Sequence, residues 1–229
     1  LKESILEGLQ VYGDSFTFTK LKNRLLDSED NTGPKLVGRI SKLLDKDPFV
    51  YEGNNFSWKE IFNNQGKVNI FQLKGYVIDI QKVITEFILW DLYNYTERQG
   101  DKSFPIPVLL DEMQNLNHKD SSPTTRILKE GRKFGWSSWL ATQSISSIKS
   151  NGDVSSLFNS AQQIHFSPPE DQINYVSKTL SSDNNKRKEL EIELSLLGKG
   201  ECIVNGYAVI NGELRKVIET IEINSLENR

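Results

Sequence analysis

The spacing of apolar residues between positions 79 and 141 constrains the fold more than any other feature of this sequence. Residues 79–97 place an apolar side chain at every third or fourth position, the pattern of a helix with one buried face. Residues 106–110 then form a short apolar run, typical of a parallel strand that is buried on both faces. A helix at residues 121–134 and a second apolar strand at residues 136–141 follow. This order predicts an α/β fold with a parallel sheet flanked by helices.

The C-terminal third predicts one more strand and helix of this kind, followed by an antiparallel extension. The Ser-Pro-Pro-Glu-Asp run at residues 167–171 is a strong helix start, because it offers a capping serine, proline in the first turn and acids near the helix dipole. Two Asn-Gly pairs indicate hairpin turns, at Asn205-Gly206 and Asn211-Gly212. The other elements expected here are helices at 154–158 and 188–197, a polar loop at 181–187, and strands at 161–166, 201–204, 207–210 and 214–223.

The first 66 residues are predicted to form an irregular, mainly helical insertion segment. Residues 1–12, 15–26 and 36–44 carry helical patterns, and residues 27–34 read as a polar loop that contains Gly33-Pro34. The α/β part is expected to begin at residue 67, with a first strand at 68–73. The predicted domains are therefore 1–66 and 67–229.

Composition excludes several classes of protein. The 28 basic and 31 acidic residues give a net charge of −3, so any DNA contact must come from a local basic patch. The single cysteine, Cys202, cannot form an intramolecular disulfide and fits a reducing, cytoplasmic compartment. No apolar run approaches the length that spans a membrane. The chain starts at Leu1 without an initiator methionine, and we expect it to be a fragment of a longer protein.

Polar residues follow both central strands. Asp111-Glu112 comes directly after the first strand, and Thr142-Gln143 ends the second. If the strands are parallel neighbours, these side chains meet at the edge where α/β sheets bind ligands. The first acid could then hold a Mg²⁺ shell and the second could polarise water, while the amide of Gln143 could sense a γ-phosphate. The alternative is a pair of strands that end in ordinary polar loops.

The helix between the two strands ends in Arg132-Lys133, before Phe134 and Gly135. Cations are ordinary at a helix C-terminus, where they complement the dipole. The alternative is functional, because an exposed guanidinium on a rigid helix end can serve a neighbouring subunit as an arginine finger.

Taken together, these motifs resemble the HerA/FtsK superfamily of hexameric, RecA-like, DNA-pumping ATPases, and its HerA-like branch in particular. The resemblance covers residues 68–223. Within that branch it points to a bacterial defence ATPase of the phosphorothioation-dependent restriction type, with a nuclease as a candidate partner. The runs that carry it are the apolar strand with Asp111-Glu112, then Glu130-Gly131-Arg132-Lys133-Phe134-Gly135, then Ala141-Thr142-Gln143-Ser144, with support from residues 163–171 and 196–206.

The resemblance implies a role for each matching residue. Asp111 is the Walker B acid of the Mg²⁺ shell, Glu112 the catalytic base and Gln143 the sensor, with Thr142 beside the nucleotide. Arg132 is the arginine finger that acts in trans, and Lys133 is its companion at the nucleotide. ATP and Mg²⁺ are the implied cofactors, and a homo-hexamer acting on DNA is the implied assembly.

One departure from the family is serious, because the phosphate-binding loop Gly-x-x-x-x-Gly-Lys-Ser/Thr is absent. The nearest run, Gly33 to Gly38, continues with Arg39-Ile40 and is expected to be a loop and a helix start. The chain is therefore expected to be the C-terminal half of the motor and to bind ATP poorly by itself. Two alternatives remain: a scaffold domain that has lost nucleotide binding, and an ATPase that acts on protein, as in secretion or conjugation.

The remaining candidate residues have ordinary explanations. His118 and His165 lie far apart in the sequence without a cluster of metal ligands. The basic run at residues 186–188 is typical of a solvated loop, with a DNA contact as the alternative, and the same holds for Lys149.

Overall fold

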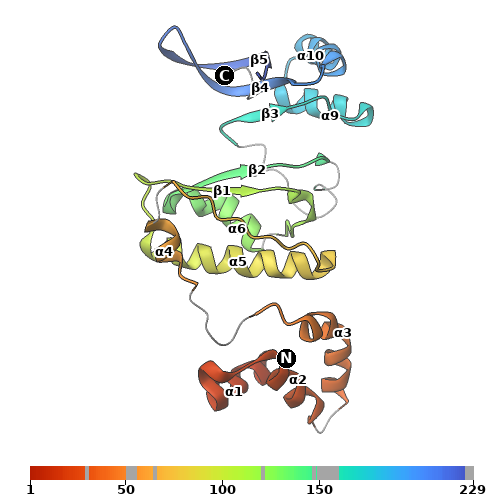
Figure 1. Ribbon diagram of the computed structural model, residues 1–229. Helices are drawn as coiled ribbons and strands as arrows, with labels where there is room; N and C mark the ends of the chain where they lie inside the picture. The colour runs from red at the N-terminus through yellow and green to blue at the C-terminus, as the bar shows by residue number, and fades with distance from the viewer. Residues whose placement is uncertain are drawn as a thin grey trace. The chain divides into compact units, whose positions relative to one another are not determined.

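The computed structural model describes residues 1–28, 31–49, 56–63, 66–119, 122–145, 148 and 160–224. The chain divides into two compact units, Leu1–Tyr95 and Thr96–Arg229. Figure 1 shows the helices and strands coloured in chain order from red to blue. The expected domain boundary after residue 66 stays a prediction. The expected helix at 154–158 and the candidate Lys149 lie outside the described residues.

The first unit opens with three helices around a small apolar core. The helices are α1 Lys2–Tyr12, α2 Phe18–Leu26 and α3 Thr32–Lys46, with a short 3-10 turn at Gly13–Ser15. Thr17 caps α2, because its hydroxyl accepts from the backbone N–H of Lys20 at 3.2 Å. The buried core residues are Leu21, Leu25, Val37 and Leu44, against which Ile5, Phe16, Phe18, Leu36 and Ile40 pack.

Helix α3 begins at Thr32, so the predicted loop at 27–34 is too long. Pro34 is compatible with the first helical turn, and Gly33 is needed because a Cβ there would lie 1.8 Å from the carbonyl oxygen of Leu25. The whole Gly33 to Gly38 run is helical. Its interior N–H groups are directed along the helix rather than into a cradle, so it is not a phosphate-binding loop.

The rest of the first unit consists of α4 Trp58–Asn63 and most of α5 Ile78–Gln99. The Trp58 indole N–H donates to the Asp91 carboxylate at 2.7 Å, and its ring stacks on Phe62. The strand predicted at 68–73 is wrong, because no ladder forms there. The segment has the strand pattern, but a strand also needs a partner for its backbone groups.

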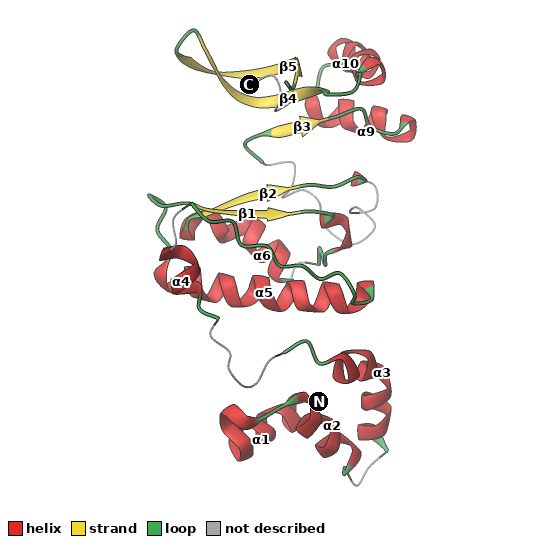
Figure 2. Cartoon of the chain, in the orientation of Figure 1, coloured by secondary structure: helices red, strands yellow, loops and turns green. Residues whose placement is uncertain are grey.

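The second unit contains the predicted pair of parallel strands (Figure 2). Strand β1 Ile106–Leu110 pairs with β2 Trp136–Leu140, from Ile106 opposite Trp136 to Leu110 opposite Leu140. They are connected through a 3-10 turn at Met113–Asn115, helix α6 Pro123–Glu130 and a second 3-10 turn at Gly131–Phe134. The strand–helix–strand order predicted for this region is confirmed.

Local chemistry explains where α6 begins and ends. The Ser122 hydroxyl accepts from the Thr125 N–H at 3.2 Å and caps the helix, which Pro123 then enters. Gly135 stops the following turn with φ 84°, a conformation that suits glycine. Directly after it, the buried Trp136 indole donates to the Thr96 hydroxyl at 2.7 Å and anchors the start of β2.

A separate antiparallel sheet, β3–β4–β5, completes the second unit. Its strands are β3 Gln163–His165, β4 Glu201–Ile210 and β5 Glu213–Glu222, and the helices are α9 Glu170–Leu180 and α10 Asn184–Leu196. Val176, Leu180, Leu190, Leu194 and Ile203 form its buried core. Over its described residues the chain is thus mixed α/β, with a two-stranded parallel sheet and a separate three-stranded antiparallel sheet.

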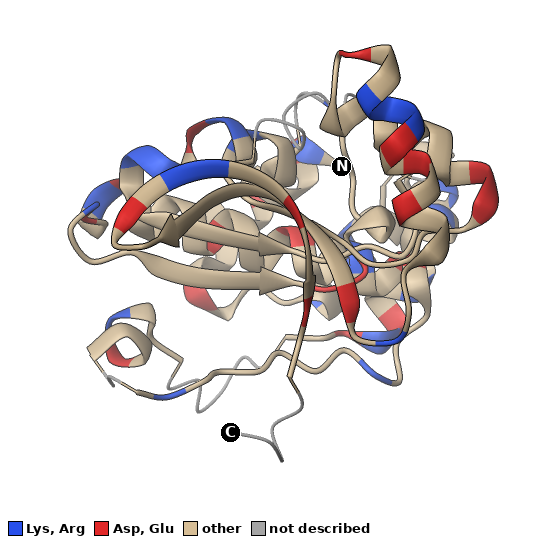
Figure 3. Ribbon diagram, turned by 90° about the horizontal axis from the view of Figure 1, so that it is seen from above, with Lys and Arg blue, Asp and Glu red and all other residues tan. Residues whose placement is uncertain are grey.

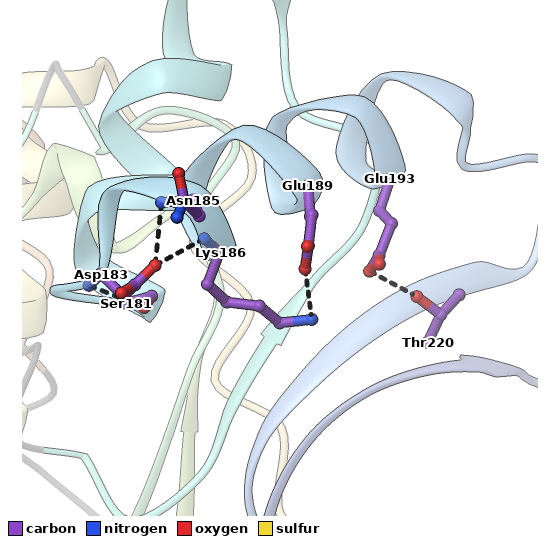
Figure 4. A network of polar contacts seen from close by, with 7 residues as sticks. All are labelled: Ser181, Asp183, Asn185, Lys186, Glu189, Glu193 and Thr220. Atoms are coloured by element: carbon purple, nitrogen blue, oxygen red, sulfur yellow. Dashed lines mark hydrogen bonds and ion pairs between the residues drawn. The ribbon is translucent and has the colours of Figure 1, made fainter.

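Three expectations about this region are wrong. Strand β3 pairs antiparallel with β4 and does not extend the parallel sheet. Asn205-Gly206 lies inside β4, where a Cβ at position 206 would lie 2.9 Å from the Ala161 carbonyl oxygen and would displace the Gln162 side chain. Helix α10 starts at Asn184 rather than 188, because the Asp183 carboxylate accepts from the N–H groups of Asn185 and Lys186, both at 2.8 Å (Figure 4).

The hairpin turn at Asn211-Gly212 is confirmed. Asn211 has φ 53° and Gly212 has φ 83°, as a two-residue type I′ turn requires.

Two glycine substitutions in α3 are expected to act in opposite directions on thermal stability. Gly33→Ala should cost about 1–3 kcal/mol, because the new Cβ would meet backbone that must shift. Gly38→Ala should gain up to about 1 kcal/mol in helix propensity, since a Cβ there meets nothing within 4 Å. Thermal unfolding followed by circular dichroism measures both, and shifts of equal sign would contradict the close approach of α2 and α3.

Candidate functional site

The ends of β1 and β2 meet at one edge because the strands are parallel and in register. The Ala141 N–H donates to the Leu110 carbonyl at 2.9 Å, and the Met113 N–H donates to the Ala141 carbonyl at 3.0 Å. These two bonds continue the pairing past the strands. They bring the loop that carries Asp111 and Glu112 against the loop that carries Thr142 and Gln143.

The carboxylate of Glu112 is held by two side-chain amides. Gln143 Nε2 donates to one of its oxygens, and Gln114 Nε2 donates to the other. Gln114 is held in turn, because the Thr142 hydroxyl donates to its Oε1 at 2.7 Å. The structure therefore brings together three of the predicted site residues, Glu112, Thr142 and Gln143, through a fourth residue that had not been predicted.

The backbone at Glu112 is strained. It has φ 52° and ψ 40°, the left-handed region that non-glycine residues rarely adopt. Asp111 accepts from the Glu112 N–H through Oδ1 at 2.9 Å, and the buried His118 donates from Nε2 to the Met113 carbonyl at 2.8 Å. Such conformations cluster at functional sites, where the surrounding bonds maintain them.

The loop after β2 is also fixed from the side of α9. Gln172 on that helix is buried, and its Oε1 accepts from the Ile145 N–H at 3.3 Å. Its amide donates to the Ser144 hydroxyl at 3.4 Å, and the Ser144 N–H donates to the Thr142 hydroxyl at 3.2 Å. The position of Thr142 therefore depends on a helix that starts almost thirty residues later.

Sequence reasoning missed both glutamines. Gln114 lies only two positions after Glu112, and an amide so close in sequence to a candidate base is a possible hydrogen-bond donor to its carboxylate. Gln172 sits in the first turn of a predicted helix, and nothing in the sequence connects it to residues 144 and 145.

Arg132 and Lys133 lie at the opposite edge of the parallel pair. They belong to the turn before β2, whereas Gln143 follows β2, so a strand of five residues separates them. That strand is roughly 16 Å long. Both side chains are exposed, and neither forms an ion pair with any residue that the structure describes. The structure does not bring Arg132 to the Glu112 carboxylate of the same chain.

The residues present fit one part of a Mg²⁺–ATP site. Asp111 is exposed at the strand end, and Mg²⁺ commonly takes one or two carboxylates together with water and phosphate oxygens. Among the described residues, no group of three acids, histidines or cysteines is placed to hold a metal alone. The phosphate cradle does not fit, because Gly33 to Gly38 is helical and belongs to the other unit.

The remaining titratable candidates do not form a site. Burial raises the pKa of the Cys202 thiol, which keeps it protonated and unreactive. A separate open hollow of about 440 Å³ lies within the first unit, between α4 and residues 68–71, where Glu60 is its single charged lining residue. It is not near the Glu112 loop in sequence and contains no pair of catalytic groups.

No protein-family model matches this sequence, and no curated protein matches it. Across the described part of the chain, every helix is too short or too polar to cross a membrane.

Removing the Thr142 hydroxyl is expected to weaken the native state. Thr142→Val should cost about 1–2 kcal/mol, because it leaves the Gln114 oxygen and the Ser144 N–H without this partner. Thr142→Ser keeps the hydroxyl and is the matched control. Denaturant unfolding followed by tryptophan fluorescence measures the difference, and equal stability of the two variants would contradict the network.

His165 is expected to make the fold sensitive to mild acid. Burial lowers its pKa below the ordinary value of 6.5, and its buried Nε2 has no hydrogen-bond partner in the described structure. The unfolded chain therefore takes up a proton near pH 6.5 while the native state does not, so stability falls as pH drops below that value. In His165→Gln, the free energy of unfolding between neutral pH and about pH 5.5 should vary less. An unchanged slope would contradict this assignment.

Proposed function

We propose that this chain supplies the metal-binding and water-activating half of an ATPase site, in a HerA/FtsK-like ring ATPase that moves or remodels DNA. The observation that carries the proposal is the Glu112 carboxylate, held by the amides of Gln114 and Gln143 at the carboxyl edge of two parallel strands. Exposed Asp111 stands beside it. This pairing of two acids with different surroundings is the arrangement that phosphoryl transfer to water requires.

Each residue at this edge has a distinct proposed role. Asp111 would hold Mg²⁺, which when bound neutralises charge on the phosphate oxygens. Glu112 would accept a proton from the attacking water, with its orientation fixed by the two amides. Gln143 could contact that water or the terminal phosphate, and Thr142 positions the second amide of the clamp.

Arg132 and Lys133 are proposed to serve a neighbouring subunit. They are exposed and lie at the opposite end of β2 from Gln143, so they are free to meet another chain's nucleotide. A planar guanidinium suits that role, because it can bind phosphate oxygens with two donors at once. This part of the proposal implies a ring of identical subunits, most simply a hexamer with a RecA-like fold. We further propose that the ring acts on DNA, works with a nuclease and is located in the cytoplasm.

The proposal also requires a phosphate cradle that the described residues do not form. A second candidate function follows from that observation: a scaffold domain with this fold that does not bind nucleotide. Basic and acidic residues are interspersed along the ribbon (Figure 3). DNA binding needs a local basic patch, so this mixing of charges favours the scaffold over a DNA motor. DNA-stimulated hydrolysis by the intact protein separates the two candidates.

The central prediction concerns ATP hydrolysis by the intact protein that contains these 229 residues. Glu112→Gln should lower DNA-stimulated hydrolysis by at least about 100-fold, because the amide cannot accept the proton. Arg132→Ala should lower it by about 1,000-fold if the guanidinium stabilises transition-state charge. Gly38→Ala, in the helical Gly33 to Gly38 region, is the control and should hydrolyse ATP normally.

Mixing the two inactive variants tests the role between subunits. A mixed ring contains some sites with an intact Glu112 and an intact neighbouring Arg132, so part of the activity should return. Full activity in both single variants would contradict the site assignment. Loss of activity in both, without recovery on mixing, would contradict only the action of Arg132 in trans.

A further inference from the structure

Helix α3 gathers its basic residues on one exposed face. They are spaced four, three and four positions apart in the sequence. On a helix of 3.6 residues per turn they therefore point within a sector of about 60° and form a row about 16 Å long. All of these side chains are exposed. We call them the basic stripe: Lys35, Arg39, Lys42 and Lys46.

The opposite face of α3 fixes the direction of the stripe. Val37 and Leu44 are buried in the core of the first three helices, and Ile40 packs against them. Gly33 lies on the same side and allows the close approach to α2, because a Cβ there would lie 1.8 Å from the Leu25 carbonyl oxygen. The stripe lies half a turn away from this face, so it points out of the three-helix core.

The charge of the stripe is not compensated within the part of the chain that the structure describes. Helix α3 contains one acid, Asp45, and its carboxylate is already paired with Lys22 of α2 at 2.7 Å. No stripe cation forms an ion pair with a described residue. Acids follow the helix at Asp47 and precede it at positions 27–30, so the centre of the stripe is farthest from them.

The basic run at residues 186–188 offers a contrast, because its cations are used within the chain. Lys186 forms an ion pair with Glu189 at 3.2 Å (Figure 4). Arg187 donates from Nε to the Ser181 carbonyl at 2.7 Å. The charges of the chain as a whole are mixed, but α3 supplies the local basic patch that DNA binding needs.

A row of cations on a rigid helix suits a polyanion. Duplex DNA carries one negative charge for about every 1.7 Å of its axis, so a stripe about 16 Å long can meet several phosphates at once. Neutralising those phosphates releases counterions, which favours binding.

Two other anionic partners fit the stripe less well. Helices that bind membranes insert an apolar face into the lipid, but the apolar face of α3 is buried in the protein core. Proteins that bind single-stranded nucleic acid stack the bases on aromatic side chains, and the stripe contains none. The stripe therefore favours a duplex.

We propose that the basic stripe of α3 binds the phosphate backbone of double-stranded DNA. Helix α3 follows α2 after a short connection and turns its free face outward, as the second helix does in DNA-binding helix-turn-helix motifs. Contacts from lysine and arginine to phosphates carry no sequence information, so binding should not depend on base sequence. The site belongs to a different compact unit from Glu112 and does not rest on ATP hydrolysis.

Fluorescence anisotropy with a labelled duplex of arbitrary sequence tests the site without nucleotide. The chain of residues 1–229 should bind the duplex at about 50 mM salt, and its affinity should fall steeply as salt rises. Arg39→Ala/Lys42→Ala should weaken binding at least about tenfold and reduce the slope of log affinity against log salt by about 2. Absence of binding by the parent chain would overturn the proposal.

Lys186→Ala/Lys188→Ala is the matched control, because it removes the same charge from α10. It should keep the affinity of the parent chain within about twofold. Alanine favours helix, so both double variants should keep the parent's circular dichroism. Equal weakening by the two double variants would reveal a general effect of net charge and would contradict the assignment to α3.

Acetylation of lysines maps the contact without any substitution. Lys35, Lys42 and Lys46 are exposed and should react several-fold more slowly when the duplex is present. Lys188 is also exposed and should react at an unchanged rate. Mass spectrometry of the digested chain measures these rates, and protection of Lys188 without protection of Lys42 would place the contact elsewhere.

Competitors distinguish DNA from other polyanions. At equal charge concentration, unlabelled duplex should displace the labelled duplex more effectively than polyglutamate, because duplex DNA has the higher charge density and releases condensed counterions. Equal or stronger competition by polyglutamate would overturn DNA as the partner and would indicate an acidic protein.

Discussion

The in-register parallel pairing of β1 with β2 is the constraint on which the candidate site depends. It places the residues after Leu110 and after Leu140 at one edge, and it places Arg132 at the other. The connection between the strands runs from Asp111 to Gly135, and its α-helix, α6, has only eight residues. Ser122 caps the start of α6, and Gly135 ends the 3-10 turn that follows this helix. These two residues fix where the chain enters β2. A change of one residue in this register would move Gln143 away from Glu112, because successive side chains in a strand face opposite ways.

Strain and hydrogen bonding are balanced at Glu112. A left-handed conformation costs a residue with a side chain about 1–2 kcal/mol. A hydrogen bond to a charged group contributes about 1.5–3 kcal/mol in favourable surroundings, and two amides bond to this carboxylate. Even when solvent screening reduces their strength, the two bonds can offset the backbone strain. The result is a carboxylate with a defined orientation on a short loop, as a general base requires.

The sequence predicted those elements whose pattern is local. The apolar runs at 106–110 and 136–140 and the long stripe of α5 each carry a complete periodic signal, and the observed bounds agree closely with it. The proximity of Gln143 to Glu112 could also be predicted, because it follows from two neighbouring parallel strands.

The errors arose where the partner of a segment decides its structure. Residues 68–73 have a strand pattern but no ladder, and residues 163–165 pair with β4 rather than with the parallel sheet. Asn205-Gly206 resembles a turn, yet Gly206 serves a close approach by Gln162 within a continuous strand. Gln172 could not be connected to Ser144 before the path of α9 was known.

Metal rescue at Asp111 in the intact protein tests the proposed role of this edge most directly. Asp111→Cys places a soft sulfur ligand where an oxygen stood, so hydrolysis supported by Mg²⁺ should be lost and hydrolysis supported by Mn²⁺ or Cd²⁺ should return. Asp111→Ala should recover with neither metal. Undiminished hydrolysis with Mg²⁺ in both variants would show that Asp111 does not hold the metal and would contradict the account.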